Sequence, residues 1–129
     1  ILSIDSYINT VNSFIKSMKT FGDVIIMTNA QTDWIMYVFE HYKLPIPEEI
    51  RLCPIVSARE YSVGTKLSVE HYKTYALHTY HNMYNKYDHI ISVGDSVYER
   101  NAVFQLKHNK SHLKVCQIDL YVYTHRNFV

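Results

Sequence analysis

The chain is poor in the residues that interrupt regular structure, with three glycines and three prolines among 129 residues. This scarcity excludes collagen-like and low-complexity linker chains, and a hydrophobic content of 47% is typical of a globular domain. An excess of charge of one sign is also lacking, since the formal net charge is +1. Such a chain has no long-range field to attract nucleic acid or an anionic membrane, and we expect neither partner.

Long apolar runs are absent as well. No stretch approaches the roughly 20 residues of a transmembrane helix, and none resembles a secretory signal peptide. The only cysteines, Cys53 and Cys116, lie in strand-like segments, which suits reduced core residues. We therefore expect an intracellular, cytoplasmic protein. The length fits one domain over residues 1–129, and because the chain opens with Ile we expect a fragment or a processed product.

Helical and strand-like patterns alternate along the chain. Apolar residues at helical spacing predict helices over residues 5–20, 32–42 and 68–86, and another after residue 96. In the third of these helices, the residues expected to face inward are Val69, Tyr72, Ala76, Tyr80 and Met83. Apolar runs predict strands over residues 23–27, 52–56, 90–93 and 113–118, with a loop over residues 59–67. Pro54 lacks an N–H donor, which favours an edge strand. This order predicts an α/β fold with a mainly parallel sheet.

The most informative stretch is residues 90–99, in which an apolar run ends in Gly94-Asp95-Ser96 and a helical segment follows. In open α/β sheets, ligands bind beyond the carboxyl ends of the strands, so Asp95 is expected at that crevice. A carboxylate there suits a hard cation such as Mg²⁺. Ser96 and Glu99 also match a capping box, which explains both residues without any metal.

Two further residues are expected at the same crevice. Thr28 ends the strand over residues 23–27, and Lys73 lies in the first turns of the helix that leads into the Asp95 strand. A hydroxyl, an ammonium group and a metal-binding carboxylate together make an anion site, most naturally for phosphate. The alternatives are that Thr28 and Asn29 only form a polar turn and that Lys73 is a solvated helix residue.

These segments resemble a known family. Residues 24–29, Lys73 and residues 94–99 are similar to motifs II, III and IV of the haloacid dehalogenase (HAD) superfamily. Residues 30–34 and 56–59 further resemble a group of poorly characterised eukaryotic HAD-like proteins. The resemblance covers roughly residues 5–110.

The resemblance implies a Rossmann-like three-layer sandwich and Mg²⁺-dependent phosphoryl transfer through an aspartyl-phosphate. Thr28 would bind a phosphoryl oxygen of a phosphorylated substrate of unknown type, and Lys73 would neutralise the phosphorylated intermediate. Asp95 would hold Mg²⁺, and Glu99 would support the metal site. No cap module fits in the short segment between residue 56 and Lys73.

The chain departs from the family at its first motif, a central strand that ends in Asp-x-Asp and supplies the nucleophile. No Asp-x-Asp occurs in the 129 residues. Asp5 follows a short apolar stretch, but residue 7, where the motif requires a second Asp, is Tyr. A helix is also expected directly after Asp5, where the motif has the end of a strand. We therefore expect an HAD-like core that lacks the first-motif strand.

Two other functions compete with the phosphohydrolase. One is a catalytically silent HAD-like domain that binds a partner or a phosphorylated ligand. The other is a nucleotide-binding regulator of receiver-like topology, with Asp5 or Asp95 as phospho-acceptor.

Three other motifs are set aside on the sequence. Residues 64–66 match only the end of a P-loop, because the required Gly at position 59 is Arg. The pairs His78/His81 and His108/His112 have zinc-like spacing but no obvious third ligand. The tyrosines of residues 72–87 follow inward helical spacing without a basic stripe, which favours core packing over RNA binding.

Overall fold

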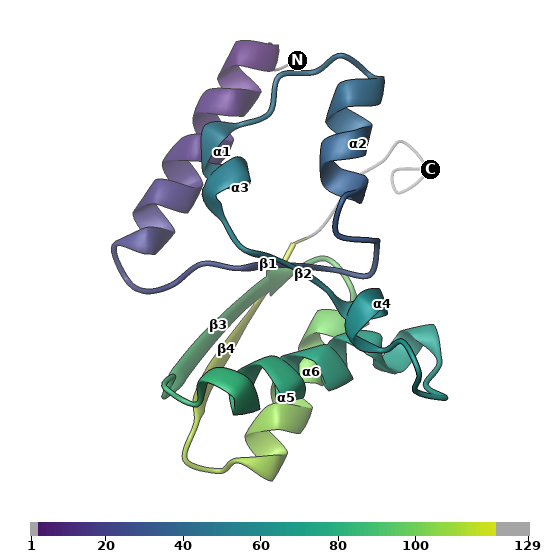
Figure 1. Ribbon diagram of the computed structural model, residues 1–129. Helices are drawn as coiled ribbons and strands as arrows, with labels where there is room; N and C mark the ends of the chain where they lie inside the picture. Colours follow the sequence, from purple (N-terminus) through teal and green to yellow (C-terminus); the bar gives the residue numbers. More distant parts are fainter. Residues whose placement is uncertain (1–2, 121–129) are drawn as a thin grey trace, which may run out of the picture. The chain divides into compact units, whose positions relative to one another are not determined.

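The computed structural model describes residues 3–120, and it divides into two compact units, Ile1–Glu60 and Tyr61–Val129 (Figure 1). A single domain over residues 1–129 stays a prediction.

The first unit combines helices with one pair of short strands. Its elements are α1 (Ile4–Lys19), β1 (Ile26–Thr28), α2 (Trp34–His41), α3 (Glu48–Leu52), β2 (Ile55–Ser57) and the start of α4 (Ala58–Tyr61). Strands β1 and β2 are parallel, with Ile26 opposite Ile55. Helix α1 packs against α3, where Lys19 Nζ lies 2.7 Å from the buried Glu49 carboxylate.

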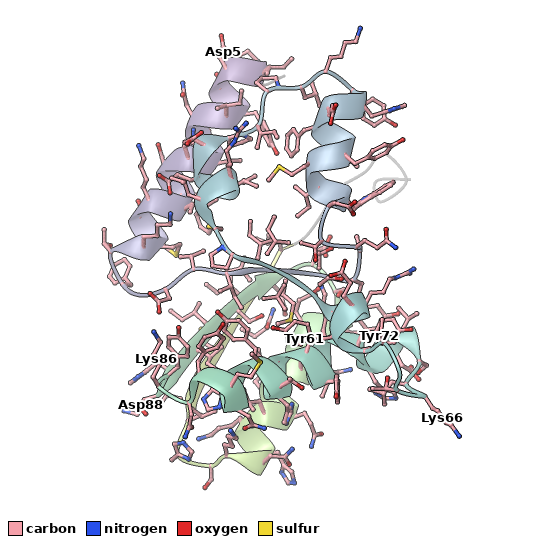
Figure 2. All side chains as sticks on the ribbon, viewed as in Figure 1. Asp5, Tyr61, Lys66, Tyr72, Lys86 and Asp88 are labelled. Carbon is pink, nitrogen blue, oxygen red and sulfur yellow. The ribbon has the colours of Figure 1, made fainter. Side chains whose placement is uncertain are left out.

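Helix α1 begins where the sequence predicts a helix. Ser3 is its N-cap, and the Ser3 hydroxyl accepts a hydrogen bond of 3.1 Å from the amide of Ser6. Asp5 therefore lies in the first turn of a helix (Figure 2). A negatively charged carboxylate is stabilised at this end by the positive end of the helix dipole. It does not end a strand, as a nucleophile of the family's first motif would.

The second unit holds the segment around Asp95. Its elements are the 3₁₀ helix η1 (Val69–His71), α5 (Tyr72–Tyr84), β3 (His89–Gly94), α6 (Val97–Asn109) and β4 (Lys114–Asp119). Strands β3 and β4 are parallel, in register from His89 opposite Lys114 to Gly94 opposite Asp119. Helix α6 packs on both strands and on α5. The buried apolar core of this unit comprises Ala76, Ala102, Val103, Leu106 and Leu113.

Strand β3 forms where predicted, but it is not buried on both faces. Ile91 and Val93 are 61% and 38% exposed, and they alternate with half-buried residues. The reason is that α6 covers one face of the β3–β4 pair, and the side chains of a strand point alternately to its two faces. Cys116, opposite Ile91, is consequently exposed instead of lying in the core, while Cys53 is buried.

Several predicted boundaries are wrong. Helix α3 occupies part of the predicted strand over residues 52–56, so β2 starts only after Pro54. The predicted loop over residues 59–67 is helical at its start, because α4 extends to Tyr61. The long helix predicted over residues 68–86 is divided into η1 and α5, and it ends at Asn85, whose φ of 41° is left-handed. Val69 and Met83, predicted to face inward, are exposed, whereas Ala76 is buried.

The structure confirms a mixed helix and strand chain with parallel strand pairs. Within residues 3–120, no helix is both long enough and apolar enough to cross a membrane.

Candidate functional site

The carboxyl edge of the β3–β4 pair carries Asp95. Gly94 ends β3 and Asp119 ends β4, and the amide of Leu120 donates a hydrogen bond of 2.8 Å to the Gly94 carbonyl. Because the strands are parallel, both of their carboxyl ends lie at this edge. The Asp95 side chain is exposed, and it has no hydrogen-bond or ion-pair partner among residues 3–120. It is therefore available to a ligand.

The turn after Asp95 confirms the capping-box interpretation of Ser96 and Glu99. Ser96 is the N-cap of α6, and its hydroxyl accepts a hydrogen bond of 3.2 Å from the amide of Tyr98. Glu99 Oε2 accepts from the Ser96 amide at 2.9 Å and also from the Ser96 hydroxyl. The capping box fixes the orientation of the Glu99 side chain at the start of α6.

Glu99 also forms an ion pair with Lys73, the second residue of α5. Lys73 Nζ donates to Glu99 Oε1, and both side chains are only 14% exposed. Burial raises the pKa of Glu99, but the hydrogen bonds from Lys73 and Ser96 outweigh burial, and the pKa of Glu99 is lowered overall. The structure thus brings Lys73 into direct contact with Glu99, a residue of the predicted 94–99 motif. The Lys73 ammonium group is already paired with the Glu99 carboxylate.

Of the two predicted metal ligands, Asp95 fits better than Glu99. Mg²⁺ in proteins usually takes one or two carboxylates and keeps several waters. Both oxygens of Glu99 are engaged, by Lys73 and by Ser96. Within residues 3–120, no group of three or more His, Cys, Asp or Glu side chains is arranged to hold a metal ion. The described residues therefore offer Asp95 as a single carboxylate ligand, while Glu99 orients Lys73.

Thr28 ends β1 in the first unit, as predicted, and its hydroxyl takes part in a polar turn. Thr28 Oγ1 accepts a hydrogen bond of 3.0 Å from the amide of Ala30. Ser57 donates to the Ala30 carbonyl at 2.6 Å, and the Glu60 carboxylate accepts from Thr32 at 2.8 and 2.7 Å. These contacts confirm the turn interpretation. A role for Thr28 in binding a phosphoryl oxygen stays a prediction.

Two charged residues at the carboxyl edge of β3–β4 were not predicted from the sequence. Asp119 ends β4, and its Oδ2 accepts a hydrogen bond from the guanidinium group of Arg100 on α6. The signal for Asp119 was present, because it follows an apolar strand just as Asp95 does. For Arg100 there was no such signal, since only the packing of α6 on β4 brings it to this edge.

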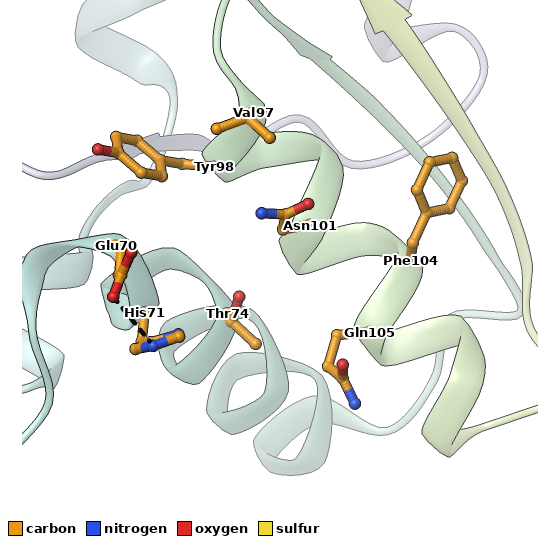
Figure 3. Close-up of a pocket in the computed structure, with 8 residues that line it drawn as sticks. All are labelled: Glu70, His71, Thr74, Val97, Tyr98, Asn101, Phe104 and Gln105. Carbon is orange, nitrogen blue, oxygen red and sulfur yellow. Dashed lines mark ion pairs between the residues drawn. The ribbon is translucent and has the colours of Figure 1, made fainter.

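A shallow groove of about 590 Å³ lies on the second unit, between η1–α5 and α6 (Figure 3). Thr74 lies on the α5 side of the groove, and Asn101 and Gln105 lie on the α6 side. The remaining lining residues are Glu70, His71, Val97, Tyr98 and Phe104. None of the eight is Lys or Arg, so the groove is not suited to hold a phosphate group.

The first pair of histidines with zinc-like spacing, His78 and His81, bonds to neighbouring groups. His78 Nδ1 lies 2.8 Å from the Thr74 carbonyl, and His78 Nε2 lies 2.9 Å from Asn109 Nδ2. The buried His81 lies 3.1 Å from the Tyr87 carbonyl and 2.8 Å from Lys110 Nζ. Both nitrogens of the His78 and His81 rings are therefore engaged by protein groups.

Comparison with protein families, with characterised proteins and with solved structures found no match to this chain.

Proposed function

We propose that this chain is the core of a HAD-type, Mg²⁺-dependent phosphohydrolase that acts on a phosphorylated substrate of unknown type. The observation that carries the proposal is the contact of Lys73 with Glu99 in the first turn of α6. This helix follows Asp95, whose carboxylate has no partner among residues 3–120. These residues come from two separate helices and the end of β3. Lys73 is held by Glu99, which lies four residues after the accessible Asp95 carboxylate at the end of a parallel strand. A positive group and a free carboxylate supplied by one strand end suit the binding of phosphate together with a hard cation.

The proposal includes the finer fold, a Rossmann-like three-layer sandwich with a mainly parallel sheet. In the family that the sequence resembles, the first-motif strand is central in the sheet. The described strands form two parallel pairs, β1–β2 and β3–β4. Parallel pairing within each unit agrees with a mainly parallel sheet and supports this part of the proposal.

Each residue then has a role that its chemistry allows. Asp95 would contribute a carboxylate to the Mg²⁺ site, and the bound ion would supply positive charge to the phosphate group. Lys73, oriented by Glu99, would add positive charge nearby. Thr28 would donate its hydroxyl hydrogen to a phosphoryl oxygen. We also propose an intracellular setting, because Cys53 and Cys116 are both free thiols.

A second candidate is a catalytically silent HAD-like domain that binds a partner or a phosphorylated ligand. The observation that favours it is the lack of an Asp-x-Asp sequence, together with the position of Asp5 in a helix. The chemistry of Lys73, Asp95 and Thr28 is to stabilise charge, and none of the three replaces a carboxylate nucleophile placed in line with phosphorus.

Hydrolysis of p-nitrophenyl phosphate with Mg²⁺ tests the two candidates. We expect residues 1–129 alone to be inactive, and a polypeptide in which an Asp-x-Asp strand precedes residue 1 to be active. Substitution of the first Asp of that strand by Asn is the matched control and should abolish the activity. If the longer polypeptide is inactive yet binds phosphate, the silent binding domain is correct. Turnover by residues 1–129 that is lost in Asp5→Asn would instead make Asp5 the nucleophile.

A further inference from the structure

The geometry points to Arg100, held by Asp119, as a phosphate-binding residue at the carboxyl edge of the β3–β4 pair. The ligand class is the phosphate group of a monoester or inorganic phosphate. This inference deepens the proposed function and rests on it, since it assigns the phosphate to a cation that the family resemblance did not indicate.

The position of Arg100 follows from its partner. One terminal nitrogen of its guanidinium group donates to Asp119 Oδ2. Asp119 is the last residue of β4 and lies opposite Gly94, which directly precedes Asp95. The hydrogen bond of 2.8 Å from the Leu120 amide to the Gly94 carbonyl continues the pairing of the two chain segments beyond the strands. The guanidinium group is therefore held at the edge that carries Asp95.

Arg100 is more accessible than Lys73. The Lys73 side chain is 14% exposed and donates to Glu99, whereas the Arg100 side chain is 44% exposed. A guanidinium group has five N–H donors in a planar fork, and Arg100 uses one hydrogen bond to reach Asp119. The remaining donors suit the two-point binding of phosphate oxygens that is typical of Arg.

Lys107, near the end of α6, and Lys110, the residue that caps this helix, both bond to groups around its C-terminal end. Lys107 Nζ donates to the carbonyls of Ser111 at 2.6 Å and Leu113 at 2.5 Å. Lys110 Nζ lies 2.8 Å from His81 Nδ1. Among the cations of α6, Arg100 is thus the one placed at the carboxyl edge of the strands.

Asp119 has the role of a positioning residue. The structure gives Arg100 a single contact with it, through Oδ2, while Asp119 Oδ1 is buried without a donor among residues 3–120. A contact through one oxygen orients the guanidinium group, and the other edge of its fork has no partner among residues 3–120. Removing the Asp119 charge should therefore release Arg100 from its position.

Calorimetric titration of the 129-residue chain with inorganic phosphate tests the inference. We expect Arg100→Gln to weaken phosphate binding at least tenfold and Arg100→Lys to weaken it less, because Lys keeps the charge but not the fork. The matched control is Lys114→Gln, which removes an exposed positive charge at the opposite end of the same strand pair. It should change the affinity less than twofold.

Asp119→Asn distinguishes two effects of Asp119 on phosphate binding, namely its positioning of Arg100 and its negative charge. It makes the site more positive, so a purely electrostatic effect would strengthen phosphate binding, whereas loss of positioning should weaken it several-fold. If Arg100→Gln does not fold, the side-chain NMR signals of Arg100 in the unmodified chain must still shift on addition of phosphate.

The inference is overturned if the chain does not bind phosphate, if Arg100→Gln and Lys114→Gln weaken binding equally, or if Asp119→Asn strengthens it. Failure of the proposed enzyme is a separate result. Phosphate binding that depends on Arg100, without hydrolysis in the longer polypeptide, would retain this site and reject only the phosphohydrolase.

Discussion

Glu99 packs directly over Gly94, so that a Cβ atom on Gly94 would lie 2.5 Å from Cγ of Glu99 and 2.8 Å from its Oε2. The absence of a side chain at position 94 therefore allows the Glu99 carboxylate to reach both Ser96 and Lys73. Gly94 is needed here for close approach, which explains why one of the three glycines of the chain ends this strand.

Gly94→Ala should accordingly lower the free energy of unfolding by about 1–3 kcal/mol, because an added methyl group forces Glu99 out of the capping box. Chemical denaturation followed by circular dichroism measures the change. Gly22→Ala is the matched control, since no atom lies within 4 Å of a Cβ built there. Equal effects of the two substitutions would contradict the close packing of Gly94 and Glu99.

Glu99→Gln separates the capping role of Glu99 from its ion pair. Gln still serves a capping box, but it leaves the half-buried Lys73 ammonium without a carboxylate, which should cost about 1–3 kcal/mol of stability. Glu70→Gln is the control, because the Glu70–His71 pair is exposed and should contribute little.

The double variant Lys73→Met/Glu99→Gln should lose less stability than the sum of the single losses. Strict additivity would mean that the pair contributes nothing.

The same pair predicts a dependence on pH. The pKa of Glu99 is lowered in the folded state, so its contribution is fully present above the unfolded-state pKa of Glu, about 4.3. It is lost as the pH falls through the lower folded-state pKa. The stability difference between the parent chain and Glu99→Gln should therefore be constant from neutral pH to about 5 and should shrink below about 4. Hydrogen bonds from Thr32 also lower the pKa of Glu60. Because Glu60 is present in both chains, its contribution cancels in the stability difference. A difference that persists at low pH would refute the ion-pair origin.

Local features of the site could be predicted from the sequence because they depend on neighbouring residues. The capping box joins Ser96 to Glu99 within a single turn, and the Thr28 hydroxyl bonds to an amide two residues further on. The position of Lys73 near the start of a helix also follows from local spacing. In each case the interacting groups are fixed by one helix or one turn.

Features that depend on packing could not be predicted. Lys73 and Glu99 are 26 residues apart in sequence, and Arg100 and Asp119 are 19 apart. The apolar run of β3 indicated a strand but not how many of its faces would be covered, and Ile91 is 61% exposed. A sequence pattern specifies the direction of side chains along a strand, whereas burial depends on which helices pack on it.

The exposed carboxylate of Asp95 is the predicted ligand for Mg²⁺. Asp95 should bind Mg²⁺ weakly and with several retained waters, because residues 3–120 place a single unpaired carboxylate at this edge and the ion prefers six oxygen ligands in near-octahedral geometry. Calorimetry should show that Asp95→Asn weakens or abolishes the binding. Asp88→Asn is the matched control, because it removes an exposed carboxylate just before the opposite end of β3 and should leave the affinity unchanged. Glu99→Gln should alter Mg²⁺ affinity little, since both oxygens of Glu99 already bond to Lys73 and Ser96. Equal affinity in the parent chain and in Asp95→Asn would remove Asp95 from the metal site, and a loss confined to Glu99→Gln would transfer that role to Glu99.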